Sequence, residues 1–281
     1  MRFIFEKIKN FSEPYIIAEI AANHNGDLNL AKELIDQAVK AGADCVKFQS
    51  WTKESIFSRK VYEENYFLND DYRNRDDYTL KEIVEEFSLN KSELKQLKQY
   101  CDEIGIDFGC TPFSKDEVDF LVDELKIPFI KIASMDVNNL PFIEYIASRN
   151  VPIILSTGLS EMSEIDEAVR TIEKYHQKII LLHCVSNYPP QDENVNLRNI
   201  TMLQEYYHPY SIGFSDHSIG VEIPLAAVAL GAAVIEKHFT LDKDMFGWDH
   251  KVSADYHELV KIVEGSKRIV NALGSYRRYL T

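Results

Sequence analysis

Long apolar runs are missing from this chain of 281 residues, since no stretch approaches the 18 consecutive apolar residues that a membrane-spanning helix needs. The first ten residues, MRFIFEKIKN, hold too short an apolar run for a secretion signal. Cysteine is scarce, and no two cysteines stand in a C-x-x-C spacing. Scattered cysteines are usually reduced and buried, so we expect a cytoplasmic protein with no membrane partner. The four are Cys45, Cys101, Cys110 and Cys184.

Basic residues are outnumbered, with 31 Lys and Arg against 45 Asp and Glu, which gives a net charge of −14. Such a surface repels polyanions, so we expect no nucleic-acid partner. An anionic substrate would therefore have to be held by a local cluster of lysines or backbone donors.

The chain also lacks a linker, a low-complexity tract and a G-x-G-x-x-G motif after its first apolar run. The missing glycine motif weakens a dinucleotide-binding interpretation. Without a linker, residues 1–281 are expected to form one domain, a length that α/β barrels reach as a single unit.

Eight short runs rich in β-branched residues alternate with amphipathic stretches along the whole chain. Several of the runs are almost continuously apolar, as parallel strands buried on both faces are. Eight strand-then-helix units predict a single closed (β/α)8 barrel. The predicted strands are residues 15–20, 45–49, 107–110, 129–132, 152–156, 179–183, 211–214 and 234–238. The predicted helices are residues 29–41, 91–104, 115–125, 141–149, 161–175, 197–206, 222–230 and 256–272.

Residues 51–90, after the second strand, interrupt this rhythm with a polar and aromatic insertion. A loop of this length inside a compact domain is usually a functional lid or a disordered segment. Its tyrosines are expected to pack rather than to react. Its aromatic and acidic residues include Tyr62, Tyr66, Phe67, Asp70, Asp71, Tyr72 and Tyr78.

Polar side chains follow nearly every predicted strand, where barrel enzymes carry their active sites. Lys47 and Lys131 stand inside the apolar runs VKF and IKI, where a solvated lysine does not fit, and Glu19 stands inside IAEIAA. Buried charges of this kind indicate a functional site. Short hydroxyl side chains at the same strand ends favour a phosphate pocket, although each serine alone is as readily structural. They are Ser134, Ser156, Ser186 and Ser215.

His217 and His238 end adjacent strands, the seventh and the eighth. One such histidine is more often structural, but two together favour a shared divalent cation bound through neutral imidazole nitrogens. Two protein ligands would leave positions open for water and substrate, as at a catalytic metal. Asp136 and Asp249 are as readily helix caps as site residues. His24 and His250 are either supporting or surface residues, and Cys184 is expected in the core.

Seven segments of the chain, in order, resemble the sialic acid synthase family. They are IIAEIAANHNGDLNLAKELIDQAVKAGADCVKFQ (16–49), CTPFS (110–114), KIAS (131–134), PIILSTGLS (152–160), LLHCVSNYP (181–189), GFSDHSIGVEIPLAAVALGAAVIEKHFTLDK (213–243) and GWDHKVS (247–253). The resemblance implies condensation of phosphoenolpyruvate with the open-chain aldehyde of an N-acylated amino sugar, with release of phosphate. It also implies a divalent metal, usually Mn²⁺ with Mg²⁺ or Co²⁺ as alternatives.

The resemblance assigns roles to particular residues. The two metal histidines match His217 and His238, whose ion would polarise the aldehyde oxygen. The acidic residues near the reacting carbons match Glu19 and Asp136, and Glu19 would stabilise positive charge at carbon 2. The groups that bind phosphoenolpyruvate match Lys47, Lys131, Thr111, Ser134, Ser156, Ser186 and Ser215. The sugar-side groups match Gln49, Tyr188 and Asp249.

Three departures from the family pattern point to an altered sugar pocket. Asp136 stands where many members have glutamate, and Trp248 stands where many have proline. Members commonly carry a C-terminal antifreeze-like domain, which this sequence is expected to lack. We therefore expect Trp248 and the insertion to act as a lid, and either a separately encoded antifreeze-like protein or a second copy of the chain as a partner.

Two other functions stay open. One is a Schiff-base pyruvate aldolase with Lys131 or Lys237 as the nucleophile. The other is a non-catalytic sugar- or phosphate-binding barrel, which the complete set of polar strand ends argues against.

Overall fold

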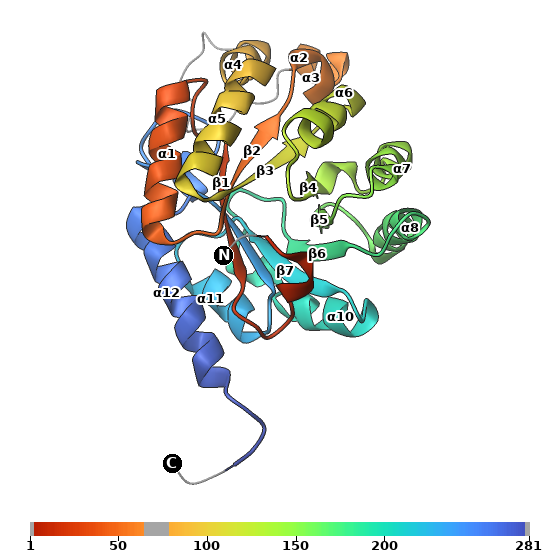
Figure 1. Cartoon of the computed structure of the whole chain (residues 1–281), viewed down its shortest axis with the longest axis vertical. Coiled ribbons are helices and arrows are strands. Elements are labelled where there is room, and N and C mark those ends of the chain that lie inside the picture. The colour runs from red at the N-terminus through yellow and green to blue at the C-terminus, as the bar shows by residue number, and fades with distance from the viewer. Residues whose placement is uncertain (1–2, 65–78, 279–281) are drawn as a thin grey trace.

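The computed structural model describes residues 3–64 and 79–278. Eight parallel strands form a closed barrel in sequence order, and β1 pairs with β8 to complete the ring (Figure 1). The predicted single (β/α)8 barrel is therefore confirmed. The strands are β1 (Tyr15–Ala21), β2 (Cys45–Ser50), β3 (Asp107–Pro112), β4 (Ile130–Ile132), β5 (Ile153–Ser156), β6 (Ile179–Cys184), β7 (Ser211–Asp216) and β8 (Val234–His238).

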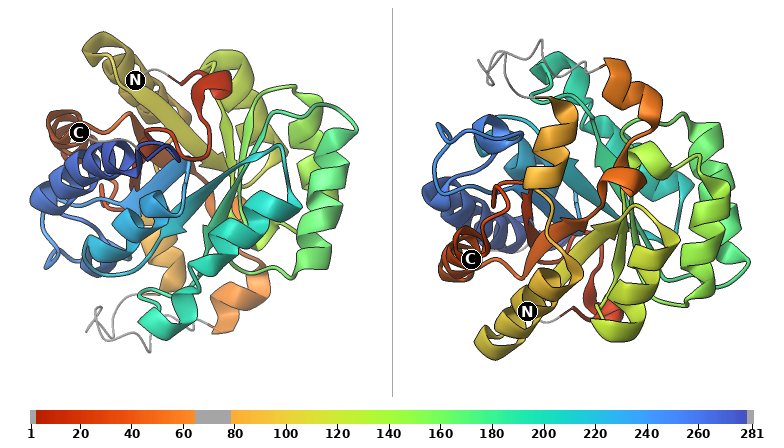
Figure 2. Two further views of the ribbon diagram at one scale, coloured as in Figure 1. Left: turned by 90° about the horizontal axis from the view of Figure 1, so that it is seen from below. Right: turned by 90° about the horizontal axis from the view of Figure 1, so that it is seen from above.

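Helices surround the barrel on all sides (Figure 2), and they begin and end within a few residues of the predicted positions. Local sequence explains the boundaries of α1, where the Asp27 side chain accepts hydrogen bonds from two backbone amides and Gly42 ends the helix in the left-handed conformation. After α6 the chain continues as a π-helical turn, Phe120–Glu124. The helices of the ring are α1 (Leu28–Ala41), α5 (Lys91–Ile104), α6 (Lys115–Asp119), α7 (Leu140–Ser148), α8 (Met162–Glu173), α10 (Arg198–Tyr206), α11 (Glu222–Ala229) and α12 (Tyr256–Leu273), with a short α9 (Asp192–Val195) before α10.

The barrel interior begins with an apolar cluster at the start of the strands. Ile17, Phe129 and Ile154 belong to this cluster, and Phe3 from the N-terminal segment packs on Phe129 at 4.8 Å between ring centroids. A larger apolar cluster joins the outer faces of the strands to the helices. The charged side chains that point into the barrel lie at its opposite, C-terminal end; they are Glu19, Lys47, Lys131 and Glu236.

The insertion folds as short helices in its described part: α2 (Lys53–Ile56), α3 (Arg59–Glu64) and α4 (Leu80–Glu86). The disordered-segment alternative is wrong for this part, because Thr52 and Thr79 begin capping boxes and Leu80, Ile83 and Val84 bury one helical face. The lid alternative stays a prediction. Tyr66, Phe67, Asp70, Asp71, Tyr72 and Tyr78 lie outside the described residues. No helix in residues 3–64 or 79–278 has both the length and the apolar character needed to cross a bilayer.

Candidate active site

Two lysines and two glutamates meet inside the barrel at the C-terminal ends of the strands. Lys47 Nζ lies 2.6 Å from Glu19 Oε2 and 3.9 Å from Glu236 Oε2, and Lys131 Nζ lies 3.5 Å from Glu236 Oε1. All four side chains are buried. Thr111 Oγ1 accepts a hydrogen bond from Lys47 Nζ at 3.0 Å. The two lysines thus share one carboxylate, Glu236, between them.

Burial and pairing shift the pKa values of these groups in different directions. Burial raises the pKa of Glu19 to about 7, although Lys47 opposes the shift. Burial also acts against the charged form of Glu236, but Lys131 and Lys47 outweigh it and hold the pKa of Glu236 below its usual value. Burial lowers the pKa of Lys131. The two carboxyl groups of the cluster therefore differ in acidity, and Glu236 is the one that stays ionised more readily.

Small polar groups gather around Gly158 beside this cluster. The Gly158 amide donates to Ser134 Oγ at 2.9 Å, and a methyl group at Gly158 would come within 2.6 Å of Ser186 Oγ. Ser215 Oγ donates to Glu236 Oε1 at 2.8 Å. Among the described residues, the buried Ser156 Oγ has no hydrogen-bond partner. The absence of a side chain at Gly158 keeps the space between the serines open.

The rings of His217 and His238 lie with their centroids 5.4 Å apart, and Tyr188 stacks on His217 at 4.0 Å. His217 Nδ1 is 2.7 Å from the Val185 carbonyl oxygen, so Nδ1 carries a proton, and in the neutral ring Nε2 presents its lone pair. His238 Nδ1 is buried, 3.6 Å from Asp249 Oδ2. No group of three or more His, Cys, Asp and Glu within the described ranges is placed to hold a metal alone. An ion here would use two imidazoles and take its other ligands from water or substrate.

Comparison with known proteins identifies the family. The NeuB family model matches residues 34–278. The chain belongs to the NeuB family. It is 42% identical over 262 residues to an N,N'-diacetyllegionaminic acid synthase of Campylobacter jejuni, covering 92% of this chain and 77% of that one. It is 37% identical over 266 residues to the human N-acetylneuraminate-9-phosphate synthase, covering 95% and 73%. The resemblance to sialic acid synthases is thereby confirmed.

Solved structures agree with this family assignment. An N-acetylneuraminic acid synthetase from Leptospira borgpetersenii, solved with citrate, superimposes with a TM-score of 0.85 at 37% identity, covering 96% of this chain and 88% of that one. A 3-deoxy-D-arabino-heptulosonate 7-phosphate synthase from Thermotoga maritima gives a TM-score of 0.70 at 15% identity, which is a likeness of fold alone.

Of the remaining residues that the sequence singled out in this NeuB family chain, Gln49 and Cys184 contact groups of this site. Gln49 Nε2 donates to Glu19 Oε1 at 3.1 Å. Asp136 accepts from Asn139 at 3.3 Å through Oδ1, and burial raises its pKa. Cys184 is buried, as expected, but its sulfur lies 3.9 Å from His217 Nδ1, at the edge of the site. Glu236, which received no role from the sequence, is the residue that links the two lysines.

The loop after β1 is structural. Asn25 Nδ2 donates to the Phe246 carbonyl at 2.8 Å, and His250 Nε2 lies 3.3 Å from Asn25 Oδ1. His24 is fully buried and accepts from the Gly26 amide at 3.0 Å. His24 and His250 are therefore buried supporting residues and not surface residues: His24 holds the loop after β1 from within, and His250 joins that loop to the loop after β8.

Lys237 does not share the opening with the other charged groups. Its ammonium is 2.8 Å from Asp216 Oδ2 and also donates to the Ser218 carbonyl, on the outer face of the barrel. This geometry removes Lys237 as a Schiff-base nucleophile and leaves Lys131 for that alternative.

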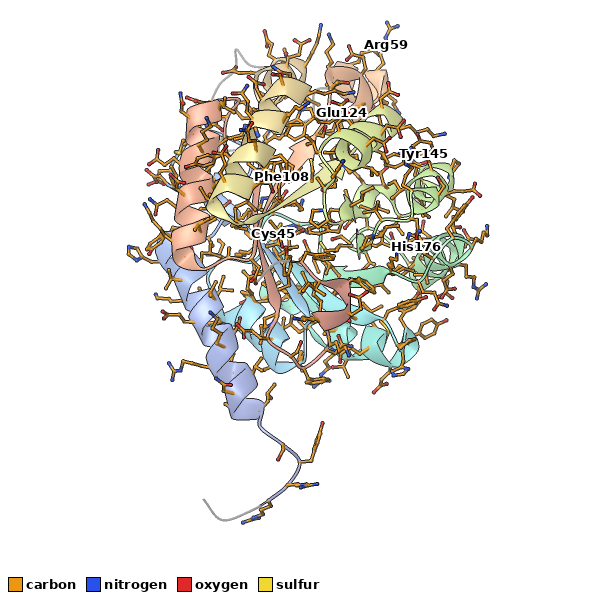
Figure 3. All side chains as sticks on the ribbon, in the orientation of Figure 1. Cys45, Arg59, Phe108, Glu124, Tyr145 and His176 are labelled. Carbon is orange, nitrogen blue, oxygen red and sulfur yellow. The ribbon has the colours of Figure 1, made fainter. Side chains whose placement is uncertain are left out.

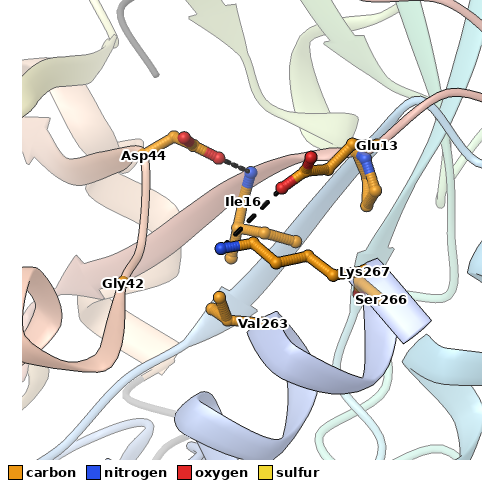
Figure 4. A pocket seen from close by; sticks show the side chains of 8 residues that line it. Glu13, Ile16, Gly42, Asp44, Val263, Ser266 and Lys267 are labelled. Carbon is orange, nitrogen blue, oxygen red and sulfur yellow. Dashed lines mark hydrogen bonds and ion pairs between the residues drawn. The ribbon is translucent and has the colours of Figure 1, made fainter. Parts of the chain in front are cut away.

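A small pocket lies away from this site, where the starts of β1 and β2 meet α12 (Figure 4). Its polar groups are engaged with one another, since Asp44 accepts from the Ile16 amide at 2.9 Å and Lys267 lies 3.8 Å from Glu13. In Figure 3, Cys45 and Phe108 lie beside the strands at the centre of the ribbon, whereas Arg59, Tyr145 and His176 lie toward its outside. The pocket contains none of the predicted site residues.

Proposed function

We propose that this protein condenses phosphoenolpyruvate with the open-chain aldehyde of an amino sugar, giving a nonulosonic acid and phosphate. The observation that carries the proposal is the pair of buried lysines, Lys47 and Lys131, that share Glu236 beside a group of serines. A lysine pair of this kind is the local positive charge that an acidic protein needs in order to hold a substrate with a carboxylate and a phosphate.

The serines and Gly158 would bind the phosphate end of phosphoenolpyruvate. Ser156 Oγ lacks a partner within the described residues, and Ser134 Oγ and Ser186 Oγ both border Gly158. An unsatisfied buried hydroxyl is costly unless a ligand completes its hydrogen bonds. Thr111, next to Lys47, and Ser215, next to Glu236, would fix the lysine end of the pocket.

His217 and His238 fit a divalent cation, because His217 presents a free Nε2 beside a second, buried imidazole. We expect Mn²⁺, with Mg²⁺ or Co²⁺ as alternatives. Such an ion supplies Lewis acidity toward a carbonyl oxygen.

The protein's own groups would then serve the rest of the reaction. A bond forms between carbon 3 of phosphoenolpyruvate and the aldehyde carbon, water adds at carbon 2, and the carbon–oxygen bond to phosphate breaks. Glu19, held by Lys47 and Gln49, would place negative charge beside carbon 2. Asp136, with Oδ2 buried and unpartnered among the described groups, would stand near the reacting carbons.

The sugar side would be formed by Gln49, Tyr188 and Asp249, with Trp248 behind them. Trp248 packs between Trp51 and Phe87 of the insertion, each at 6.1 Å between ring centroids. We propose that this contact makes the insertion a wall or lid of the sugar pocket, and replacing Trp248 with proline should change the KM for the sugar. The relatives' names include legionaminic, pseudaminic and phosphorylated neuraminic acid synthases, so they support an amino-sugar class rather than one sugar.

The test is phosphate release from phosphoenolpyruvate with a panel of amino sugars, including N-acetylmannosamine, its 6-phosphate and 2,4-diacetamido-6-deoxyhexoses. We expect release with at least one sugar, loss of it in EDTA and recovery with Mn²⁺. Borohydride trapping of pyruvate on Lys131 without phosphate release would instead identify a Schiff-base aldolase. Binding of phosphoenolpyruvate without turnover of any sugar would identify a non-catalytic barrel.

We further propose a cytoplasmic protein that works as a homodimer or with a separate antifreeze-like protein. Light scattering and co-purification would test the assembly.

A further inference from the structure

A buried ion pair lies directly behind the two histidines. Asp216 precedes His217 at the end of β7, and Lys237 precedes His238 at the end of β8. The side chains of Asp216 and Lys237 are each 1% exposed, and Lys237 Nζ is 2.8 Å from Asp216 Oδ2. The two residues are also register partners in the sheet. Each of the two strands thus leads to a histidine, and the residue before that histidine carries a charge that pairs with the corresponding residue of the neighbouring strand.

The pair also fixes the turn that carries His217. Asp216 Oδ1 accepts from the Ser218 amide at 2.9 Å and from Ser218 Oγ at 2.7 Å. Lys237 Nζ donates to the Ser218 carbonyl oxygen. Both neighbours of His217 are therefore held by side chains, while Val185 holds its ring through Nδ1.

Stability alone does not account for this arrangement. A buried ion pair loses much of its attraction to desolvation, and apolar residues of similar volume are often as stabilising in its place. What the charges add is direction, since Lys237 must sit where Asp216 and the Ser218 carbonyl can both be reached. Successive residues of a strand point to opposite faces, so fixing these outward side chains fixes where the histidines emerge.

We propose that Asp216 and Lys237 are positioning residues that set the separation and orientation of His217 and His238. This inference rests on the proposed role of the two histidines as cation ligands. Groups that orient metal ligands without touching the metal commonly change metal affinity 10- to 100-fold when they are replaced.

The test replaces the pair with apolar residues of similar size, Asp216→Leu with Lys237→Met. Mn²⁺ binding is measured by the electron paramagnetic resonance signal of free Mn²⁺, and Co²⁺ binding by visible absorption. We expect affinity for Mn²⁺ to fall roughly 10- to 100-fold. We expect the unfolding midpoint to stay within about 4 °C of the unmodified protein. The metal-free affinity for phosphoenolpyruvate should not change, because no lysine of its site is touched.

Two further variants keep the test decisive. Ser218→Ala removes one hydrogen bond to Asp216 and should lower Mn²⁺ affinity several-fold even if the double variant does not fold. Lys243→Met, which removes a half-buried ion-pair partner of Glu258, is the matched control and should leave Mn²⁺ affinity unchanged. Mn²⁺ affinity within twofold of the unmodified protein in the folded double variant would overturn the positioning role alone. Failure of the unmodified protein to bind Mn²⁺ would overturn the cation site itself.

Discussion

The two ends of the barrel interior are built from the same strands and differ completely in chemistry. The base is the apolar cluster at the start of the strands, which includes Ile17, Phe129 and Ile154. The mouth is the ionic cluster of Glu19, Lys47, Lys131 and Glu236 at their C-terminal ends. Four times an apolar residue of the base stands two positions before a charged residue of the mouth. The pairs are Ile17 before Glu19, Cys45 before Lys47, Phe129 before Lys131 and Val234 before Glu236. Residues two apart point to the same face of a strand, so both sets enter the barrel. Position along the strand, rather than the face, separates the apolar base from the ionic mouth.

The difference separates stability from function. The base cluster gains free energy by removing apolar surface from water. The mouth loses free energy by burying charges, which their mutual pairing only partly offsets. A barrel with this division should stay folded when a charge at the mouth is changed, provided that its base is intact. The following variants test this expectation at the mouth and at the base.

The largest effect is expected for Lys131→Met at the mouth. The change removes one of two positive charges and leaves Glu236 with Lys47 at 3.9 Å. Loss of a buried charge partner costs about 2–5 kcal/mol, so kcat/KM for phosphoenolpyruvate should fall roughly 10³-fold. Lys95→Met, at a largely exposed lysine 3.9 Å from Glu124, is the control and should change nothing. A loss below tenfold for Lys131→Met would contradict the proposed binding role.

At the base, Phe129→Ala should have the opposite profile. The ring packs on Phe3 and lies where a side chain at Gly109 would strike it at 2.8 Å. Truncating a buried phenylalanine costs about 3–5 kcal/mol of unfolding free energy. Denaturant titration should show this loss, while kcat/KM at 20 °C stays within about threefold. A parallel loss of activity in the folded variant would mean that base and mouth are coupled.

The division between an apolar base and a charged mouth was largely predictable, because it depends on which residues each strand contains. Parallel strands buried on both faces become apolar runs, and a charge inside such a run, as at Lys47 and Lys131, stands out. The helices of the insertion were not predictable in the same way, since four to seven residues depend on caps and on packing against a distant loop. The role of Glu236 could have been found from the alternation of side chains along a strand. If His238 points into the barrel, Glu236 two residues earlier also does, and Lys237 between them points outward.

Acidification should lower the unfolding free energy through a buried histidine of the loop after β1 rather than through a carboxylate of the mouth. Burial lowers the pKa of His24 from 6.5 to about 3, so the folded state keeps this ring neutral while the unfolded state takes up a proton. The stabilising contribution is complete above pH 6.5 and is lost as pH falls toward 3. From pH 7 to pH 5 the contribution of His24 to the unfolding free energy should fall by about 2 kcal/mol.

The control for this pH dependence is His24→Asn, whose side chain does not titrate. Equilibrium denaturation of the two proteins at pH 7 and pH 5 should show a smaller loss for the variant, by about 2 kcal/mol. Equal losses would show that His24 is not the group responsible.

The smallest effect contrasts two neighbours at the end of β5. Ser156 Oγ has no hydrogen-bond partner in the described residues, whereas Thr157 Oγ1 donates to the Leu182 carbonyl at 3.0 Å. Ser156→Ala should therefore keep the unfolding free energy within about 0.5 kcal/mol and raise the KM for phosphoenolpyruvate about tenfold, because only the ligand uses that hydroxyl. Thr157→Val should lower the unfolding free energy by about 1 kcal/mol and leave KM unchanged. If the two variants behaved alike, the hydroxyl of Ser156 would be part of the fold, and the boundary between base and mouth would lie beyond it.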